Sequence, residues 1–423
     1  MFVSLYKSKL LAKVLTVLAG GVLAQLIAFT AIPFVTRIYE PYAFGIFANI
    51  TQTAAFLVPL ISLCLPLIIV LLPFEKEVKP FMRIAIRINV FITILLLLLS
   101  SILWAFGQSD IFIIAVLSVL FAFSIAAQEL FMFLYIREGY FALRAKLLIV
   151  QAILIAIMKL WFGFSISNDY YSLVLASITG YTLINCFCFY SSKLNQADMK
   201  LNRFTHRIKR HKDIVKYRVP LNIIDNLSLL LPILFLTYFS NPAAAGLFAL
   251  ARTVLVMPGN IIGKSLADVL LPKFVALHKA RQPLNSALVK YTCYLFVIGL
   301  MPVLIFLSFS ESIFSLIFSD KWADAALFAN WLIIWVFVNV VNKPYSSVIA
   351  IFKVEKLYFI NGLLNLTLTV LALYIAYIKE LSAVDSIMLF SIVTTIPQFI
   401  VIALGYLKAR TYDFSNLGKH QNV

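Results

Sequence analysis

Apolar stretches of twenty or more residues recur along the whole chain, and they constrain its fold more than any other feature of the sequence. At a rise of about 1.5 Å per residue, a helix of that length crosses a hydrocarbon core of about 30 Å. Hydrophobic residues make up 62% of the 423 residues, and only 13% are charged. A soluble protein is apolar in nearer half of its residues. The sequence therefore predicts an all-α polytopic membrane protein.

The apolar pattern predicts about twelve transmembrane helices. Their expected ranges are 14–36, 44–73, 84–106, 111–136, 145–165, 171–191, 219–240, 244–271, 288–309, 325–351, 357–378 and 384–407. The first range follows Lys7, Lys9 and Lys13 and continues past Pro33. It is longer than a signal-peptide core, so we expect it to remain as the first span.

Lysine and arginine are distributed very unequally between the two sides of these spans. With the N-terminus inside, 28 of the 35 lie on or beside the inner segments, and four lie within spans. Only Arg37, Lys321 and Lys379 lie in outer loops. The positive-inside rule then places both termini in the cytoplasm. The net charge of +17 does not indicate a nucleic-acid partner, because no folded basic domain collects it.

The longest polar stretch lies at the middle of the chain and carries nine basic residues against Asp198 and Asp213. We interpret residues 192–218 as a basic cytoplasmic linker. It would join a six-helix lobe at 1–191 to a second lobe at 219–409, with a cytoplasmic tail at 410–423. The linker fits an inner loop that follows the charge rule, and it also fits a basic amphipathic segment on anionic lipid headgroups.

The two halves of the chain share a repeat. Residues 41–48 (PYAFGIFA) correspond to 242–249 (PAAAGLFA), and 70–73 (VLLP) correspond to 269–272 (VLLP). Six spans separate the copies, so both copies have the same orientation and the repeat is parallel. Two matched six-helix lobes suit alternating access, in which a central site opens first to one side of the membrane and then to the other.

Two basic residues within spans are candidate ligands for an anionic substrate. A charge near the bilayer centre costs about 2.5–3.5 kcal/mol on insertion scales and needs a partner or a wet cavity. Arg252 lies in the eighth span, where the other copy of the repeat has a neutral threonine. Lys343 lies in a polar interruption, on one helical face with Asn339 and Asn342 and just before Pro344. The alternatives are a structural ion pair for Arg252 and a hydrogen-bonded helix kink at Lys343.

Polar residues at helical spacing mark further candidate cavity walls. These residues are Asn49, Gln52 and Thr53 in the second span, Ser124, Gln128 and Glu129 in the fourth, and Asn222, Asp225 and Asn226 in the seventh. Glu129 and Asp225 are candidate counter-ions or coupling sites for a proton or sodium ion, or else members of ion pairs near the inner interface. Arg37 is a candidate gate residue, and Lys159 is expected to extend towards the outer surface.

Several kinds of chemistry lack a signature in this sequence. There are no paired carboxylates, no nucleophile elbow and no phosphate-binding glycine loop. The four cysteines lie in apolar runs, and the four histidines lie in loops or the tail. We therefore expect no catalytic residue, no metal and no cofactor, and we interpret the chain as a transporter rather than an enzyme.

Several motifs resemble those of a known family. They are residues 20–25 (GGVLAQ), 33–39 (PFVTRIY), Gly45, 217–220 (YRVP), 231–232 (LP) and 246–252 (GLFALAR). They resemble Wzx-type O-antigen flippases, polysaccharide transporters of the multidrug/oligosaccharidyl-lipid/polysaccharide exporter superfamily. The resemblance extends over the full length through the span number, the parallel repeat and the basic mid-chain segment. It implies a MATE-like flippase architecture.

The resemblance also implies a substrate. It would be a short glycan on undecaprenyl pyrophosphate, an O-antigen or related polysaccharide repeat unit. The glycan would move from the cytoplasmic to the periplasmic leaflet of the bacterial inner membrane before a polymerase and chain-length machinery act on it. An arginine fork suits pyrophosphate, so Arg252 is the first candidate ligand and Lys343 the second, with the asparagine and glutamine stripes facing sugar hydroxyls. Relatives imply coupling to proton or sodium entry.

Two other functions compete with this one. A multidrug antiporter of the same superfamily would need an anionic or aromatic cavity for cationic drugs, and the basic residues within the spans oppose it. A membrane-bound polysaccharide polymerase or ligase is the enzyme alternative. By analogy it would carry a large outer loop, whereas the longest outer connection expected here is about residues 310–324.

Overall fold

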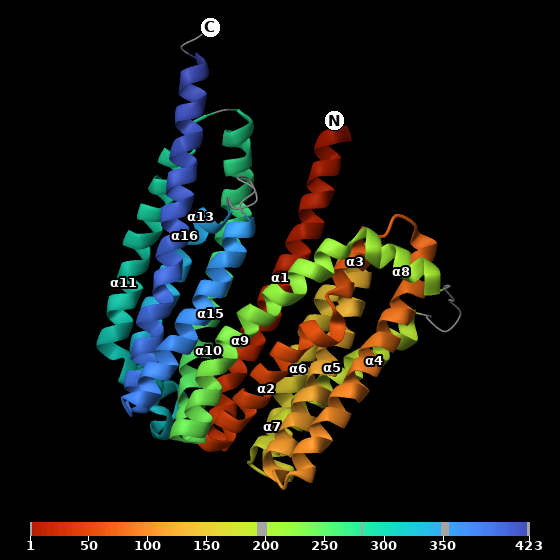
Figure 1. Cartoon of the computed structure of the whole chain (residues 1–423), viewed down its shortest axis with the longest axis vertical. Coiled ribbons are helices and arrows are strands. Elements are labelled where there is room, and N and C mark those ends of the chain that lie inside the picture. Colours follow the sequence, from red (N-terminus) through yellow and green to blue (C-terminus); the bar gives the residue numbers. More distant parts are fainter. Residues whose placement is uncertain (1, 193–200, 281, 348–354, 421–423) are drawn as a thin grey trace. The chain divides into compact units, whose positions relative to one another are not determined.

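The computed structural model describes residues 2–192, 201–280, 282–347 and 355–420. Throughout these ranges the regular elements are helices, and there is no strand (Figure 1). Packing of the Cα trace divides the chain into two compact units, Met1–Leu230 and Leu231–Val423, here called unit 1 and unit 2. The predicted all-α class is confirmed.

Unit 1 is built from the first helices of the chain. They are α1 (Phe2–Ile38), α2 (Pro41–Ser62), α3 (Leu65–Leu71), α4 (Glu75–Ala105), α5 (Ser109–Glu138), α6 (Phe141–Ser165), α7 (Tyr170–Ser192), α8 (Leu201–Arg210) and the π-helical turn η2 (Ile214–Arg218). Helix α9 (Val219–Phe235) contains the boundary between the units.

Unit 2 contains the remaining elements. They are the π-helical turn η3 (Leu236–Ser240), α10 (Pro242–Lys279), α11 (Asn285–Phe318), the 3₁₀ turn η4 (Asp320–Trp322), α12 (Ala325–Val341), α13 (Lys343–Ser347), α15 (Glu355–Ile378) and α16 (Ala383–His420). In the described ranges, eleven helical segments of the chain are long and apolar enough to cross a membrane, and α12 is a shorter apolar helix. The chain is therefore a multi-pass membrane protein.

The structure corrects the predicted extent of two spans. The second, expected at 44–73, is broken between α2 and α3, where Leu63 and Cys64 have φ angles of 46° and 53°. Left-handed backbone in residues other than glycine is strained by roughly 1–3 kcal/mol. The tenth, expected at 325–351, ends at Val341, because Pro344 cannot donate a backbone hydrogen bond to continue the helix.

The repeat has a common beginning and a different middle in the two units. Both α2 and α10 begin at a proline, and Asn241 caps α10 by accepting a hydrogen bond from the Ala244 amide at 2.7 Å. Helix α10 then continues without interruption to Lys279, whereas the matching segment of unit 1 is broken after Ser62. The two copies therefore differ in backbone conformation between their matching ends.

The connection between α11 and α12 is shorter than the sequence indicated. Helix α11 continues to Phe318, so only Ser319–Asp324 remain between the two helices, in place of the expected stretch 310–324. The loop is short because α11 continues past its expected end and includes residues that were predicted to belong to the connection.

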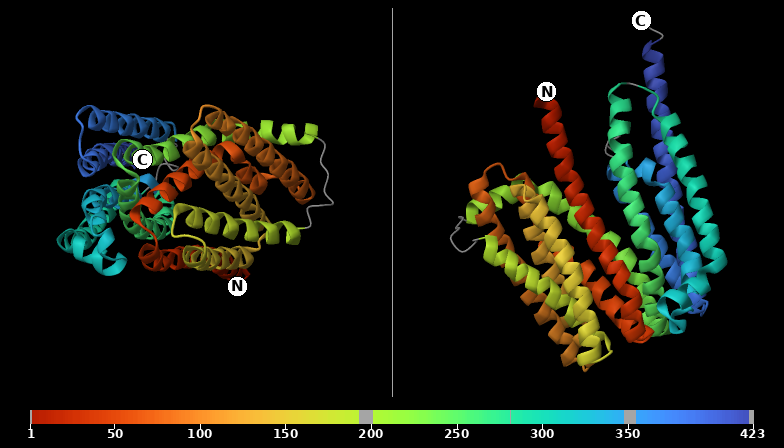
Figure 2. Two further views of the ribbon diagram at one scale, coloured as in Figure 1. Left: turned by 90° about the horizontal axis from the view of Figure 1, so that it is seen from below. Right: turned by 180° about the vertical axis from the view of Figure 1, so that it is seen from behind.

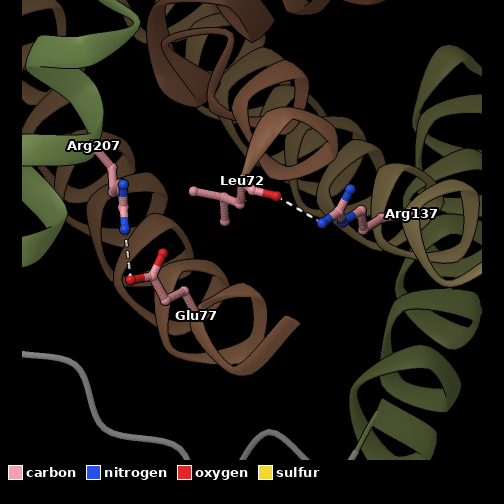
Figure 3. A network of polar contacts seen from close by, with 4 residues as sticks. All are labelled: Leu72, Glu77, Arg137 and Arg207. Atoms are coloured by element: carbon pink, nitrogen blue, oxygen red, sulfur yellow. Dashed lines mark hydrogen bonds and ion pairs between the residues drawn. The ribbon is translucent and has the colours of Figure 1, made fainter. Parts of the chain in front are cut away.

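The described part of the linker docks on unit 1. The Phe204 side chain is 2% exposed and packs against Phe81, with ring centroids 4.7 Å apart. Arg207 Nη2 donates to Glu77 Oε1 at 2.8 Å, and Figure 3 shows this ion pair between α8 and the start of α4. Beside it, Arg137 donates to the carbonyl oxygen of Leu72 at 2.6 Å, which satisfies an acceptor just past α3 (Figure 3).

Helices α1 and α6 lie along each other in unit 1 (Figure 2). A Cβ added at Gly20 would lie 2.3 Å from the Cβ of Ala145, and one added at Gly163 would lie 2.8 Å from the Tyr39 hydroxyl oxygen. Both glycines therefore permit the close approach of the two helices, as small residues do in membrane proteins.

Gly20→Ala is expected to destabilise unit 1, because the new methyl group meets the backbone as well as the side chain at Ala145. Overpacking of this kind costs about 1–3 kcal/mol. Gly21→Ala is the matched control, since a Cβ at Gly21 meets nothing within 4 Å. Thermal denaturation of the two variants in detergent, followed by fluorescence-detected size exclusion, measures the difference. Equal melting temperatures would contradict the close packing at Gly20.

Candidate functional site

Polar groups of unit 1 gather at the break between α2 and α3. Asn222 at the start of α9 donates from Nδ2 to Cys64 Sγ at 3.5 Å. The Glu129 carboxylate lies close enough to Cys64 and Tyr181 to interact with both electrostatically. We call Cys64, Glu129, Tyr181 and Asn222 the break cluster. The break thus brings together a backbone interruption and polar side chains from three neighbouring helices, α5, α7 and α9.

Glu129 lies deep in its helix. It is nine residues before the end of α5, or about 14 Å along the helix axis. Its side chain is half-buried, and among the described residues it forms neither a hydrogen bond nor an ion pair. A carboxylate in this position can accept a proton or bind a cation without first breaking a hydrogen bond or an ion pair.

Asp225 has different surroundings from Glu129, although the same roles were predicted for both residues. Its side chain is exposed, whereas Asn222 on the same helix points to Cys64. Asn226 donates from Nδ2 to the Asn222 carbonyl oxygen at 2.8 Å, which occupies its amide locally. The structure therefore brings Asn222 of the α9 stripe to the break cluster and leaves Asp225 outside it.

The α2 stripe lies nearer the start of its helix. Asn49 is 1% exposed, and its Oδ1 accepts a hydrogen bond from Thr53 Oγ1 at 3.2 Å. Its Nδ2 has no partner among the described residues. An unsatisfied buried donor costs about 1–3 kcal/mol, so this amide can bind a hydroxyl or a water. Gln52 is half-buried, and Arg37 is exposed at the end of α1.

Lys159 does not extend towards the outer surface as expected. Its Nζ lies 4.5 Å from the centre of the Phe47 ring. Lys159 is six residues before the end of α6 and Phe47 is six residues after the start of α2, so both lie about 9 Å from neighbouring helix ends. The side chain therefore extends sideways within unit 1.

The contact with Phe47 offsets only part of the cost of this charge. A cation–π contact contributes about 0.5–2 kcal/mol, whereas insertion of a charge costs about 2.5–3.5 kcal/mol. The backbone is fixed beside it, because the Tyr39 hydroxyl donates to the Lys159 carbonyl oxygen at 2.7 Å. Burial raises the pKa of Tyr39 to about 12, opposed by a hydrogen bond with Ser172, so this hydroxyl remains a donor at neutral pH.

The two predicted cations of unit 2, Arg252 and Lys343, lie at different levels along helix α10. Arg252 is half-buried on α10, ten residues after Pro242. The stem of Lys343 packs on Gly263, where an added Cβ would lie 2.8 Å from Lys343 Cε. Gly263 is eleven residues beyond Arg252, or about 16 Å along the axis. Arg252 therefore belongs to α10, while Lys343 of α13 packs against α10 at a separate level.

The two predicted asparagines of α12 also differ. Asn342 is 4% exposed, and its Nδ2 donates to Gln398 Oε1 on α16 at 2.8 Å. Its Oδ1 has no partner among the described residues. Asn339 is half-buried, and its side chain forms no hydrogen bond within the described ranges. Asn342 thus connects two helices, while the Asn339 amide keeps its hydrogen-bonding capacity for a ligand.

Sequence reasoning missed other polar groups. The amide oxygens of Asn330, Asn361 and Asn365 are buried without a partner in the described part of the chain. Gln128 and Gln151 donate hydrogen bonds to each other across α5 and α6. The spacing of Asn361 and Asn365, one helical turn apart in an apolar helix, is a signal that would have found this pair.

Comparisons with known proteins agree with this architecture. The family described as "Polysaccharide biosynthesis protein" matches residues 34–327. No curated protein sequence matches the chain. The lipid II flippase MurJ in an inward closed conformation is similar in structure, with a TM-score of 0.72 and 12% sequence identity over 96% of this chain and 91% of that one.

Two further solved structures have the same fold. One is an inward-facing multidrug resistance MATE family transporter of the MOP superfamily, with a TM-score of 0.62 and 13% identity. The other is a MOP superfamily transporter from Pyrococcus furiosus, with a TM-score of 0.57 and 13% identity. Each match covers 96% of both chains. At these identities the likeness shows the fold.

Asn342→Ala is expected to lower stability, because it removes the hydrogen bond that the half-buried Gln398 accepts through Oε1. Side-chain hydrogen bonds between membrane helices contribute about 0.6 kcal/mol on average and up to about 1.7 kcal/mol. Asn339→Ala is the control on the same helix and should melt like the wild type. Thermal denaturation in detergent measures both. If Asn339→Ala were the less stable variant, the assignment of the two amides would be wrong.

Proposed function

The chain belongs to the polysaccharide biosynthesis protein family, and from this premise we propose that it is a flippase for an undecaprenyl-pyrophosphate-linked oligosaccharide, an O-antigen or related repeat unit. It moves the glycan from the cytoplasmic to the periplasmic leaflet of the bacterial inner membrane by alternating access. A polar glycan cannot cross hydrocarbon unaided, whereas the polyprenyl tail can remain in the bilayer while the headgroup crosses.

The observation that carries this proposal is the half-buried Arg252 within the apolar part of α10. A guanidinium presents donors in a planar fork that matches the oxygens of a diphosphate. With both termini in the cytoplasm, α10 runs inward from Pro242, so Lys343 at Gly263 lies nearer the cytoplasm than Arg252. The diphosphate then meets Lys343 first and Arg252 second on its way across.

Uncharged amides in each unit are the other proposed substrate ligands. Asn49 and Gln52 of unit 1 and Asn339 and Asn342 of unit 2 supply donors and acceptors for sugar hydroxyls, and Arg37 serves at a gate. The buried Nδ2 of Asn49 and the open amide of Asn339 support this role, because each retains hydrogen-bonding capacity. Glu129 and Asp225 are the candidate coupling residues, and the deeper position of Glu129 favours it over the exposed Asp225.

A multidrug antiporter is the second candidate, since a multidrug MATE transporter has the same fold. A cationic drug needs an anionic or aromatic cavity, and the basic residues Arg252 and Lys343 favour an anionic substrate instead. The short connection Ser319–Asp324 supports transport over the polymerase or ligase alternative. In the cell, the polymerase and chain-length machinery are the proposed partners that receive the product.

Arg252→Ala is expected to lower glycolipid translocation by about tenfold or more, because a hydrogen bond to a charged group contributes about 1.5–3 kcal/mol. The assay uses proteoliposomes with an undecaprenyl-pyrophosphate-linked glycan and measures lectin access on the far side. Arg252→Lys should keep part of the activity, since it keeps the charge and loses the fork.

Lys279→Ala is the matched control, because Lys279 is exposed at the end of the same helix. Melting temperatures confirm that each variant is folded. Translocation by a folded Arg252→Ala at the wild-type rate would remove Arg252 from the site. Absence of wild-type translocation with every glycan tested, together with gradient-driven drug export, would favour the antiporter.

Glu129→Gln is expected to abolish the response of translocation to an imposed proton or sodium gradient, because the amide cannot exchange a proton or bind a cation as a carboxylate does. Glu138→Gln is the control, an exposed carboxylate at the end of the same helix. The measurement compares initial rates with and without each gradient. An unchanged gradient dependence in Glu129→Gln would exclude Glu129 from coupling.

A further inference from the structure

We propose that Lys159 is a further diphosphate-binding residue, located in unit 1 near the end formed by Tyr39 and the start of α2. This inference rests on the proposed function and adds a substrate ligand from outside the predicted set. Lys159 receives an anionic phosphate group of the lipid-linked substrate, and Phe47 holds its ammonium group when no phosphate is present.

The position of Lys159 on α6 shows that it faces the interior of unit 1. The exposed apolar residues of this half of the helix form one stripe, Ile153, Ile157, Trp161 and Phe164. Lys159 is two residues after Ile157, and at 3.6 residues per turn this places it about 200° around the helix from that stripe. Gly163, one turn further on the Lys159 side, packs against Tyr39. Lys159 therefore points away from the surface that α6 gives to lipid.

The Lys159 ammonium group has no anionic partner in the part of the chain that the structure describes. Among the residues that the structure describes, its only interaction is with the Phe47 ring, and its side chain forms no ion pair or hydrogen bond. Ionisable residues within a membrane span generally pair with a counter-charge or mark a substrate pathway. Since the described residues supply no counter-charge here, an anionic ligand is the partner that would complete the contact.

The repeat relates Lys159 to the first candidate ligand. Phe47 and Phe248 occupy the same position in the two copies, six residues after the proline that begins each helix. Lys159 lies against Phe47, and Arg252 lies one turn after Phe248 on α10. Each unit therefore has one basic residue close to the phenylalanine of its repeat copy. In unit 1 this residue comes from α6, and in unit 2 it comes from α10.

The chemistry of lysine suits a ligand that arrives and leaves. An ammonium is a compact charge on a flexible four-carbon stem, and it binds phosphate without the fixed geometry of a guanidinium fork. An aromatic face is a weaker partner than a phosphate, so the ammonium can leave Phe47 for an anion and return after release. Lys159 would then stabilise the headgroup near this end of the span without holding it there.

The experiment measures lipid binding by the purified full chain in nanodiscs. The probes are undecaprenyl diphosphate and, as the uncharged comparison, undecaprenol. Wild type is expected to bind the diphosphate lipid at least tenfold more tightly than the alcohol. Lys159→Met should weaken diphosphate binding about tenfold and leave alcohol binding unchanged. Lys159→Arg should stay within threefold of wild type, because the charge remains.

Lys146→Met is the matched control, since Lys146 is an exposed lysine on the same helix. Melting temperatures without lipid separate a folding defect from a binding defect. Unchanged diphosphate binding in Lys159→Met, or an equal loss of both lipids, would overturn the role of Lys159 and leave the flippase proposal standing. A wild type that does not distinguish the diphosphate lipid from the alcohol would count against both proposals.

Discussion

Hydrocarbon offers no hydrogen bonds, so each backbone amide and carbonyl within a span must find its partner inside the protein. Helices meet this requirement segment by segment, and the described chain uses them throughout. The requirement also makes each interruption of a helix costly unless other groups compensate for it. Interruptions are therefore informative positions, and the described residues include such a position in each unit.

The two interruptions lie beside polar side chains of the candidate functional site. In unit 1, the left-handed pair Leu63 and Cys64 lies beside Glu129 and Asn222. In unit 2, α12 ends where Asn342 binds Gln398 and the Lys343 stem packs on Gly263. Strained or broken backbone tends to persist where function requires it.

The lack of polar partners in hydrocarbon also governs where the charged residues lie. Most basic residues lie outside the spans, and those at the linker are held by specific contacts such as Arg207 with Glu77. Lys159, Arg252 and Lys343 lie within the predicted spans, and binding of an anionic substrate is the role that we propose for all three. The fold that holds them is shared with lipid II flippase and multidrug transporter structures, so the fold alone does not specify a substrate.

The sequence by itself determined the all-helical membrane class, the approximate spans and the polar residues within them, because hydrophobic length and helical spacing are local properties of the chain. Only the tertiary structure decided which of those residues meet. Asn222 reaches Cys64 while Asp225 does not, and Lys159 turns to Phe47 instead of the surface, since these outcomes depend on helices that are distant in sequence. The break after Ser62 was likewise invisible in an apolar run, because hydropathy records burial in lipid and not backbone conformation.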